Sequence, residues 1–161
     1  HYNAAIPLGD DIELIATTLW AHIPLQDAFR TEAVISDFRR IRYGVEPLDF
    51  NRFNDEHYRC FKFLRESVSS SKAKHIIVAT HHVPSFELMS PEFKGSDLNG
   101  AFTVELGDYI AASPIEYWIY GHSHRNIDKV IGNTQCISNQ LGYVFSNEHS
   151  SFDRTKHIEI V

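Results

Sequence analysis

The sequence predicts an α/β domain built around a mixed β-sheet. Three segments with the pattern of buried strands, at 12–20, 75–80 and 115–120, alternate with helical patterns, which is typical of strand–helix–strand units. Late in the chain, Gly132-Asn133 separates two short strand-like segments and indicates a hairpin, which adds antiparallel pairing. With 161 residues, 43% of them hydrophobic, the chain is long enough to bury a substantial core.

The first strand and helix are predicted from composition and stop signals. Ile12 to Trp20 is rich in residues that favour strands and carries few charges, so we expect a mostly buried strand there. Pro24 can open a helix that continues to about Arg42. Gly44 and Pro47 then end it.

A longer helix is expected after Asp49, whose side chain can cap its first turn. Apolar residues recur there at three- and four-residue spacing and form one stripe, comprising Phe53, His57, Cys60, Phe61, Leu64 and Val68. The nearly continuous apolar run from His75 to Thr80 fits a strand covered on both faces.

The second half of the chain contains shorter elements. A loop rich in Pro, Ser and Gly runs from His81 to Gly100, followed by a short amphipathic helix at about 102–111. We expect strands at 115–120, 126–131, 134–138, 142–145 and 156–161.

Composition excludes several classes of protein. The 15 basic and 21 acidic side chains give a formal charge of −6, which argues against binding nucleic acid by phosphate neutralisation. No apolar run approaches the 18 or so residues of a membrane span, and no leader pattern is present. Cys60 and Cys136 form no metal or redox motif and suit buried thiols in a reducing compartment. We therefore expect a cytoplasmic protein that is not associated with a membrane.

Two histidine clusters follow predicted buried strands. His81 and His82 come directly after one strand, and His122 and His124 come just after the next, behind Gly121. Ligands of α/β sheets bind at the carboxyl ends of strands, so these imidazoles can meet at one site. In extended backbone, residues i and i+2 point the same way, which would direct His122 and His124 into one cavity. Neutral imidazole suits zinc, iron, manganese or copper, although a surface or structural role is the alternative for each cluster.

The other histidines and acids are expected to be structural or solvated. His57 lies on the apolar stripe of the long helix and is predicted to pack rather than to bind metal. Solvated positions are predicted for His75, His149 and His157, and for the acids Glu87, Asp97 and Asp128. Imidazoles alone do not hold two close cations, which need a bridging carboxylate or hydroxide, so this candidate site is incomplete.

Several ordered motifs together resemble the C-terminal half of a calcineurin-like metallophosphoesterase. The most specific is Tyr117–His124, which ends in Gly-His-Ser-His, followed by Gly132 and the segment Asn139–Tyr143. The other segments that resemble this family are Thr17–Trp20, Ser36–Ile41 and Thr80–Ser85. The resemblance covers nearly the whole chain.

The resemblance implies a four-layer α/β/β/α sandwich with mixed sheets and two divalent metal ions, Mn, Fe or Zn, at the strand ends. By position, His122 and His124 would each bind one metal, and His81 would join His122 because it directly follows the strand. His82 would then lie near the substrate as a catalytic residue. The His-x-Pro spacing of the family would instead select His82 as the ligand.

The family's Asp-x-His, Gly-Asp and Gly-Asn-His motifs, which carry its bridging Asp and its Asn ligand, do not occur in this sequence. Residues 1–161 are therefore interpreted as the C-terminal part of a single phosphoesterase domain, a fragment that alone would have little or no activity. Tyr120 and Gln140-Leu141 also depart from the family pattern, and leave the substrate open.

The parent protein is expected to hydrolyse a phosphomonoester or phosphodiester, on a small molecule or another substrate. Ser85 and Asn139 could add hydrogen bonds to it, although a structural role in turns is the stronger expectation. The alternatives are a non-catalytic scaffold or protein-binding module with the same fold, and a self-contained domain with one metal ion. A sheet face left uncovered in the fragment would favour a homodimer.

Overall fold

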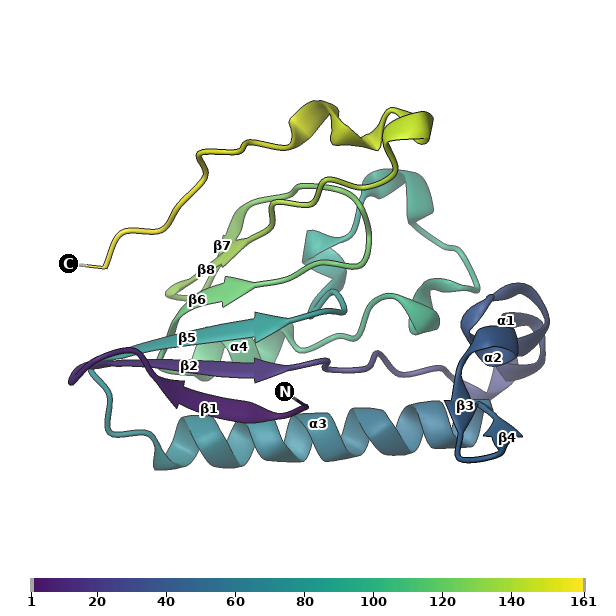
Figure 1. Cartoon of the computed structure of the whole chain (residues 1–161), viewed down its shortest axis with the longest axis horizontal. Helices are drawn as coiled ribbons and strands as arrows, with labels where there is room; N and C mark the ends of the chain where they lie inside the picture. The colour runs from purple at the N-terminus through teal and green to yellow at the C-terminus, as the bar shows by residue number, and fades with distance from the viewer. Residues whose placement is uncertain (1, 161) are drawn as a thin grey trace.

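The computed structural model describes residues 2–160 and contains a six-stranded mixed sheet (Figure 1). The strand order is β1-β2-β5-β6-β8-β7, in which β2, β5, β6 and β8 are parallel and both edge strands are antiparallel. The strands are β1 (Ala4–Pro7), β2 (Ile12–Thr17), β5 (His75–Thr80), β6 (Ile115–Ile119), β7 (Lys129–Ile131) and β8 (Thr134–Ile137). The predicted α/β class and mixed sheet are confirmed.

One face of the sheet is covered by α3 (Phe50–Ser70) and the shorter α4 (Gly107–Ala112). Asp49 caps α3 as predicted, because its Oδ1 accepts a hydrogen bond from the backbone N–H of Arg52 at 2.9 Å. The predicted stripe is confirmed, with Phe61 half-buried and the other five members buried. Phe61 connects α3 to α4, since its ring packs edge-on against Tyr109 of α4.

The opposite face is less completely covered. Ile15 of β2 is fully buried beneath α3, whereas its neighbours Leu14 and Ala16, which point to the other face, are only half-buried. The C-terminal segment contributes to this second side, where the hydroxyl of Tyr117 donates to the carbonyl of Glu159 at 2.9 Å. The sheet therefore has one densely packed face and one that is thinly covered.

The single helix predicted over 24–42 is wrong. The structure has a 3₁₀ turn η1 (Leu25–Asp27), two short helices α1 (Ala28–Val34) and α2 (Asp37–Arg40), and a small hairpin of β3 (Arg42–Tyr43) and β4 (Glu46–Pro47). Ile35 adopts extended backbone and ends α1, at the β-branched pair that it forms with Val34. Burial of Phe38 then fixes α2 as a separate turn.

The hairpin predicted at Gly132-Asn133 is confirmed between β7 and β8. Gly132 has φ +60°, and a Cβ there would lie only 2.5 Å from Cα of Ala111 in α4. Both the turn conformation and the close approach therefore require glycine. The preceding helix is shorter than predicted, because Thr103 pairs with Val83 as an isolated bridge instead of joining α4.

The last strands predicted from the sequence are wrong. Residues 144–146 and 148–151 form 3₁₀ turns, η5 (Val144–Ser146) and η6 (Glu148–Ser151), and residues 156–160 lie in no strand, with Val161 outside the described residues. The C-terminal segment is instead held by Lys156, whose Nζ contacts both carboxylate oxygens of Asp128 at 2.7 Å. Three further 3₁₀ turns lie in the predicted loop 81–100: η2 (Phe86–Leu88), η3 (Pro91–Phe93) and η4 (Asn99–Ala101).

Two sequence expectations concern the chain as a whole. Within residues 2–160, no helix combines the length and apolar character needed to cross a membrane. Cys60 and Cys136 are both buried and carry free thiols.

Replacing Asp49 by alanine should lower the free energy of unfolding by about 1 kcal/mol, because the first turn of α3 loses its side-chain acceptor. Urea unfolding followed by tryptophan fluorescence measures this change. Asp55→Ala is the matched control, since Asp55 is exposed on the same helix and caps nothing. Equal effects of the two substitutions would contradict the assigned cap.

Candidate metal centre

The parallel pairing of β5 with β6 places the two histidine clusters side by side. Ala79 is in register with Ile119, so the residues that follow both strands emerge at the same edge of the sheet. The ladder continues past the strands, because Gly121 N–H donates to the carbonyl of His81 at 3.1 Å. His81 N–H in turn donates to the carbonyl of Thr18, which extends β2. Backbone hydrogen bonds thus bring together His81 and His122, which are 41 positions apart in the sequence.

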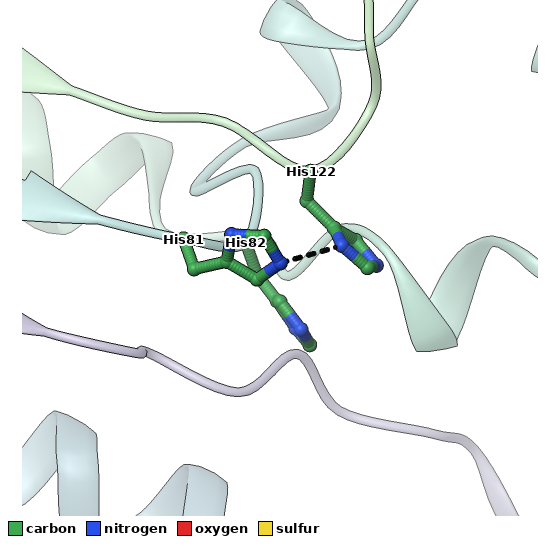
Figure 2. A group of neighbouring side chains, drawn as sticks. All are labelled: His81, His82 and His122. Atoms are coloured by element: carbon green, nitrogen blue, oxygen red, sulfur yellow. Dashed lines mark hydrogen bonds between the residues drawn. The ribbon is translucent and has the colours of Figure 1, made fainter. Parts of the chain in front are cut away.

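His81 and His122 face each other across this edge (Figure 2). His81 Nε2 lies 2.9 Å from His122 Nδ1, and the ring centroids are 4.6 Å apart. His82 completes the group, in which one ring nitrogen of each residue lies within 4.8 Å of the others. The sequence prediction that the two clusters meet is confirmed for these three residues.

His82 is placed differently from His81. Its side chain points away toward the segment after β2 (Figure 2), and only 2% of the residue is exposed. The ring stacks on His122 with centroids 4.3 Å apart and contacts the rings of Trp20 and Phe53. Its Nδ1 accepts a hydrogen bond from the backbone N–H of Ala21 at 2.6 Å. In a neutral ring the proton therefore lies on Nε2.

His124 does not join the group of three histidines, and the extended backbone expected at 122–124 is wrong. His122 and His124 have φ of +70° and +53°, the left-handed region that is unfavourable for residues with a Cβ. The alternation of an extended strand therefore does not apply here. His124 Nδ1 instead lies 2.9 Å from Oε2 of Glu148, and the ring packs edge-on against Tyr143. Left-handed residues of this kind cluster at functional sites.

Gln140 stabilises this turn through hydrogen bonds to its backbone. Its Oε1 accepts from His124 N–H at 2.9 Å, and its Nε2 donates to the carbonyl of Arg125 at 2.9 Å. Asn126 Oδ1 in turn accepts from the backbone N–H of Gln140 at 2.5 Å. Gln140 is a departure from the family pattern that the sequence analysis associated with substrate choice, and the structure gives it a role in holding the backbone of the turn.

The glycine that the site requires is Gly142 rather than Gly121. A Cβ on Gly121 would make only ordinary contacts, the nearest at 3.5 Å. Gly142 has φ +62°, and a Cβ there would lie 2.6 Å from Cβ of Glu148 and 3.3 Å from Cβ of His124. No sequence pattern singled out Glu148, and Gly142 was predicted to begin a strand over 142–145 rather than to pack against the site.

Burial keeps the imidazoles of the cluster neutral. It lowers the pKa of His122 to about 4, assisted by the nearby rings of His81 and His124. Burial also lowers the pKa of His82 well below its usual value. The pKa of His81 falls less, because the charge of Asp37 opposes the effect of burial. Neutral rings carry the lone pairs that a metal ion requires.

Two residues considered for substrate contacts have structural roles. Ser85 is fully buried, donates to Glu105 Oε1 at 2.9 Å and caps the 3₁₀ turn η2. Asn139 donates to the carbonyl of Asp153 at 2.7 Å and accepts from its N–H. Tyr120, the other departure from the family pattern, is buried and donates to the carbonyl of Ile127.

The predictions for the remaining histidines are confirmed in part. His57 packs in the core against Phe61 as predicted, and the side chain of His157 is exposed. His75 is not solvated, because its Nδ1 lies 2.6 Å from Oε2 of Glu116 and only 12% of the side chain is exposed. His149 is also misjudged, since its Nδ1 is buried. The acids Glu87, Asp97 and Asp128 form ion pairs with Lys129, Arg30 and Lys156 and are partly solvated, as predicted.

The three histidines could supply some of the ligands of one metal ion. His81 Nε2 and His122 Nδ1 converge closely enough to share a cation, and both rings are neutral near pH 7. Within residues 2–160, no Asp, Glu or Cys joins the three histidines. A pair of metal ions would therefore need carboxylate ligands from beyond this set.

A groove of about 990 Å³ lies elsewhere, between α3 and α4, and is lined by residues that include Phe61, Arg65 and Tyr109. Its lining contains no histidine, and it opens beside the start of β5 rather than the end. The convergence of ligand-type side chains, rather than hollow volume, therefore locates the candidate centre at the strand ends.

Comparison with known proteins finds a similarity to a viral protein and does not show a family for the chain. No protein-family model matches the chain. The chain is 28% identical over 165 aligned positions to an uncharacterized protein of Acanthamoeba polyphaga mimivirus. The match covers 94% of this chain and 56% of the viral protein, so the chain spans a little over half the length of that relative.

The metal-free protein should lose stability in acid because of the buried imidazoles. Unfolded histidine has a pKa of about 6.5, so below that pH the unfolded state binds more protons than the folded state does. The free energy of unfolding should be highest above about pH 6.5 and fall as the pH approaches about 4, where His122 titrates in the folded protein. For His122 the loss is on the order of 3 kcal/mol at the acid end.

Urea unfolding measured across this pH range tests the prediction. His122→Gln should flatten the dependence, whereas His157→Gln, at an exposed position on the C-terminal segment, should leave the acid-side loss in place. An unchanged slope in His122→Gln would show that the imidazole is not responsible.

Proposed function

We propose that this chain forms the histidine-bearing part of a metal-dependent phosphoester hydrolase of the calcineurin-like type. The observation that carries the proposal is the convergence of His81 Nε2 and His122 Nδ1, at 2.9 Å, on the carboxyl edge of a parallel sheet. The motif series from Thr80 to Tyr143 supports the same class, because it contains the facing histidines His81 and His122 and the amide of Gln140 that holds the turn between them and His124.

The geometry favours His81 over His82 as the ligand. His81 presents Nε2 to the cluster, while its N–H and carbonyl are held in the extended ladder by Thr18 and Gly121. Nδ1 of His82 is already engaged by Ala21, which leaves a protonated Nε2 that is a poor ligand.

His82 is better suited to support His122 than to contact a substrate. Its stacking on that ring and its 2% exposure favour a positioning role in place of the catalytic contact expected from the sequence. Replacement by Asn would keep an acceptor near the position of Nδ1 for the N–H of Ala21.

The unequal covering of the two faces of the sheet also supports the proposal that the chain forms half of a four-layer sandwich. α3 and α4 form an outer layer on one face, and the half-buried Leu14 and Ala16 lie on the other. A second sheet packed there, from further residues of the same protein, would bury that face. A second copy of the chain is the alternative cover, and would give the homodimer considered from the sequence.

Two divalent metal ions, Mn, Fe or Zn, would supply an activated water and neutralise the charge of a phosphoryl group in such a site. The chain's own part is to hold the imidazoles of His81, His122 and His124 as metal ligands at the edge of a rigid sheet. The carboxylate and amide ligands would come from residues beyond these 161, and a phosphomonoester or phosphodiester would be the substrate.

The test compares this chain with the protein extended upstream by about 100 residues, a length in keeping with ordinary domain size. We expect the extended protein to hydrolyse an aryl phosphate with Mn²⁺, Fe²⁺ or Zn²⁺, and the 161-residue chain to show little or no turnover. Rapid turnover by the shorter chain would contradict the incomplete ligand set. Inactivity of the extended protein with every metal would favour a non-catalytic scaffold.

In the extended protein, His81→Ala and His122→Ala should each reduce kcat/KM by more than the roughly 10–100-fold that loss of an outer partner of a metal ligand causes. His157→Ala is the matched control, because it removes an exposed imidazole that is far along the chain from the cluster. A loss shared equally by His157→Ala would point to general destabilisation.

A further inference from the structure

Glu148 reaches from the C-terminal loop to the ring of His124. Its Oε2 lies 2.9 Å from His124 Nδ1 and also accepts from the backbone N–H of Tyr143 at 2.6 Å. Its Oε1 lies 3.8 Å from a guanidinium nitrogen of Arg125. Only 18% of the side chain is exposed. These partners hold the carboxylate in one orientation beside the imidazole.

This contact determines which nitrogen of His124 is available. An ionised carboxylate can only accept, so the hydrogen bond requires the proton to lie on Nδ1. The lone pair of the neutral ring is then on Nε2, at the opposite side from Glu148. In His122, by contrast, it is Nδ1 that faces His81. The two histidines of one Gly-His-Ser-His segment thus offer different nitrogens.

The surrounding loop holds the ring and the carboxylate together. Tyr143 packs edge-on against His124 with centroids 4.6 Å apart. Gly142 leaves no room for a side chain, since an added Cβ would lie 2.9 Å from Oε2 of Glu148. His124 has a positive φ, and rotation of its ring would break the contact with Glu148.

We propose that Glu148 is a positioning residue, which fixes the tautomer and orientation of His124 so that Nε2 is presented as a metal ligand. A carboxylate partner on the second nitrogen of a metal-binding histidine orients the ring and raises its basicity. The identity of the ligand as a metal ion rests on the proposed function. The tautomer itself does not, and follows from the contact alone.

The tautomer is measured directly by long-range ¹H–¹⁵N correlation spectra of the ring nitrogens, in metal-free protein at about pH 8, where solvated imidazole is neutral. His124 is assigned by the signals lost in His124→Gln. We expect a ring protonated at Nδ1 in the unsubstituted chain. Glu148→Ala should give a mixture of both tautomers, and Glu148→Gln, which keeps an oxygen acceptor, should restore the Nδ1–H form at least in part.

Glu92→Ala is the matched control. Glu92 pairs with the same Arg125, at 2.7 Å, and has no contact with His124 among those the structure describes. It should leave the tautomer unchanged. Backbone amide spectra confirm that each variant is folded. A ring protonated at Nε2 in the unsubstituted chain, or no change in folded Glu148→Ala, would overturn the proposal.

A second measurement separates this inference from the proposed function. In the protein extended upstream, Zn²⁺ titrated by calorimetry should bind about 10–100-fold more weakly to Glu148→Ala than to the unsubstituted protein. Absence of Zn²⁺ binding in the unsubstituted protein would reject the metal centre and leave the tautomer result standing. Equal Zn²⁺ affinity in Glu148→Ala would reject the positioning role and leave the metal centre standing.

Discussion

Parallel pairing of β5 with β6 is the constraint on which the candidate centre depends. The ladder does not stop at Thr80 and Ile119 but continues through the backbone of His81 and Gly121, so the two loops leave the sheet in a fixed register. Side-chain contacts at the end of β5 reinforce that register. Trp118 Nε1–H donates to Thr80 Oγ1, which donates in turn to the carbonyl of His82. The facing imidazoles are therefore carried by backbone geometry, which is stiffer than a contact between free loops.

The turn after β6 shows how a strained backbone is retained. His122 and His124 both adopt left-handed φ, each at a cost on the order of 1 kcal/mol. The opposing stabilisation comes from directed hydrogen bonds, chiefly from the amide of Gln140 to both sides of His124. Neutral amides suit this task, because they donate and accept at once without adding charge beside the ligands. The backbone of this turn thus depends on polar contacts with the segment that follows β8.

The parts of the fold that follow from local pattern were predictable. The stripe of α3, its Asp49 cap, the buried run of β5 and the Gly132 turn each have a signal within a few residues, and the structure agrees with them. The sequence order also indicated that His81 and His122 would meet. The split of the 24–42 helix and the 3₁₀ turns after Gly142 were not predictable, because tertiary contacts decide them.

The same distinction applies to the candidate site. Glu148 has no motif signal, since its partner His124 is 24 residues away and the contact depends on how the C-terminal loop returns. The expectation that His122 and His124 point the same way was wrong, because both residues adopt left-handed rather than extended backbone. The proposed preference for His81 over His82 as a ligand depends on the position of one backbone amide, that of Ala21, which no spacing argument could supply.

The 2.9 Å separation of His81 Nε2 and His122 Nδ1 has a consequence for how the centre is filled. Two facing lone pairs repel, so a metal-free pair must hold one hydrogen between them. A cation that binds there needs the lone pairs of both nitrogens, and that hydrogen must therefore move to the second nitrogen of its own ring. Metal uptake is then coupled to a change of tautomer in one imidazole, and the neutral pair gains the full charge of the ion.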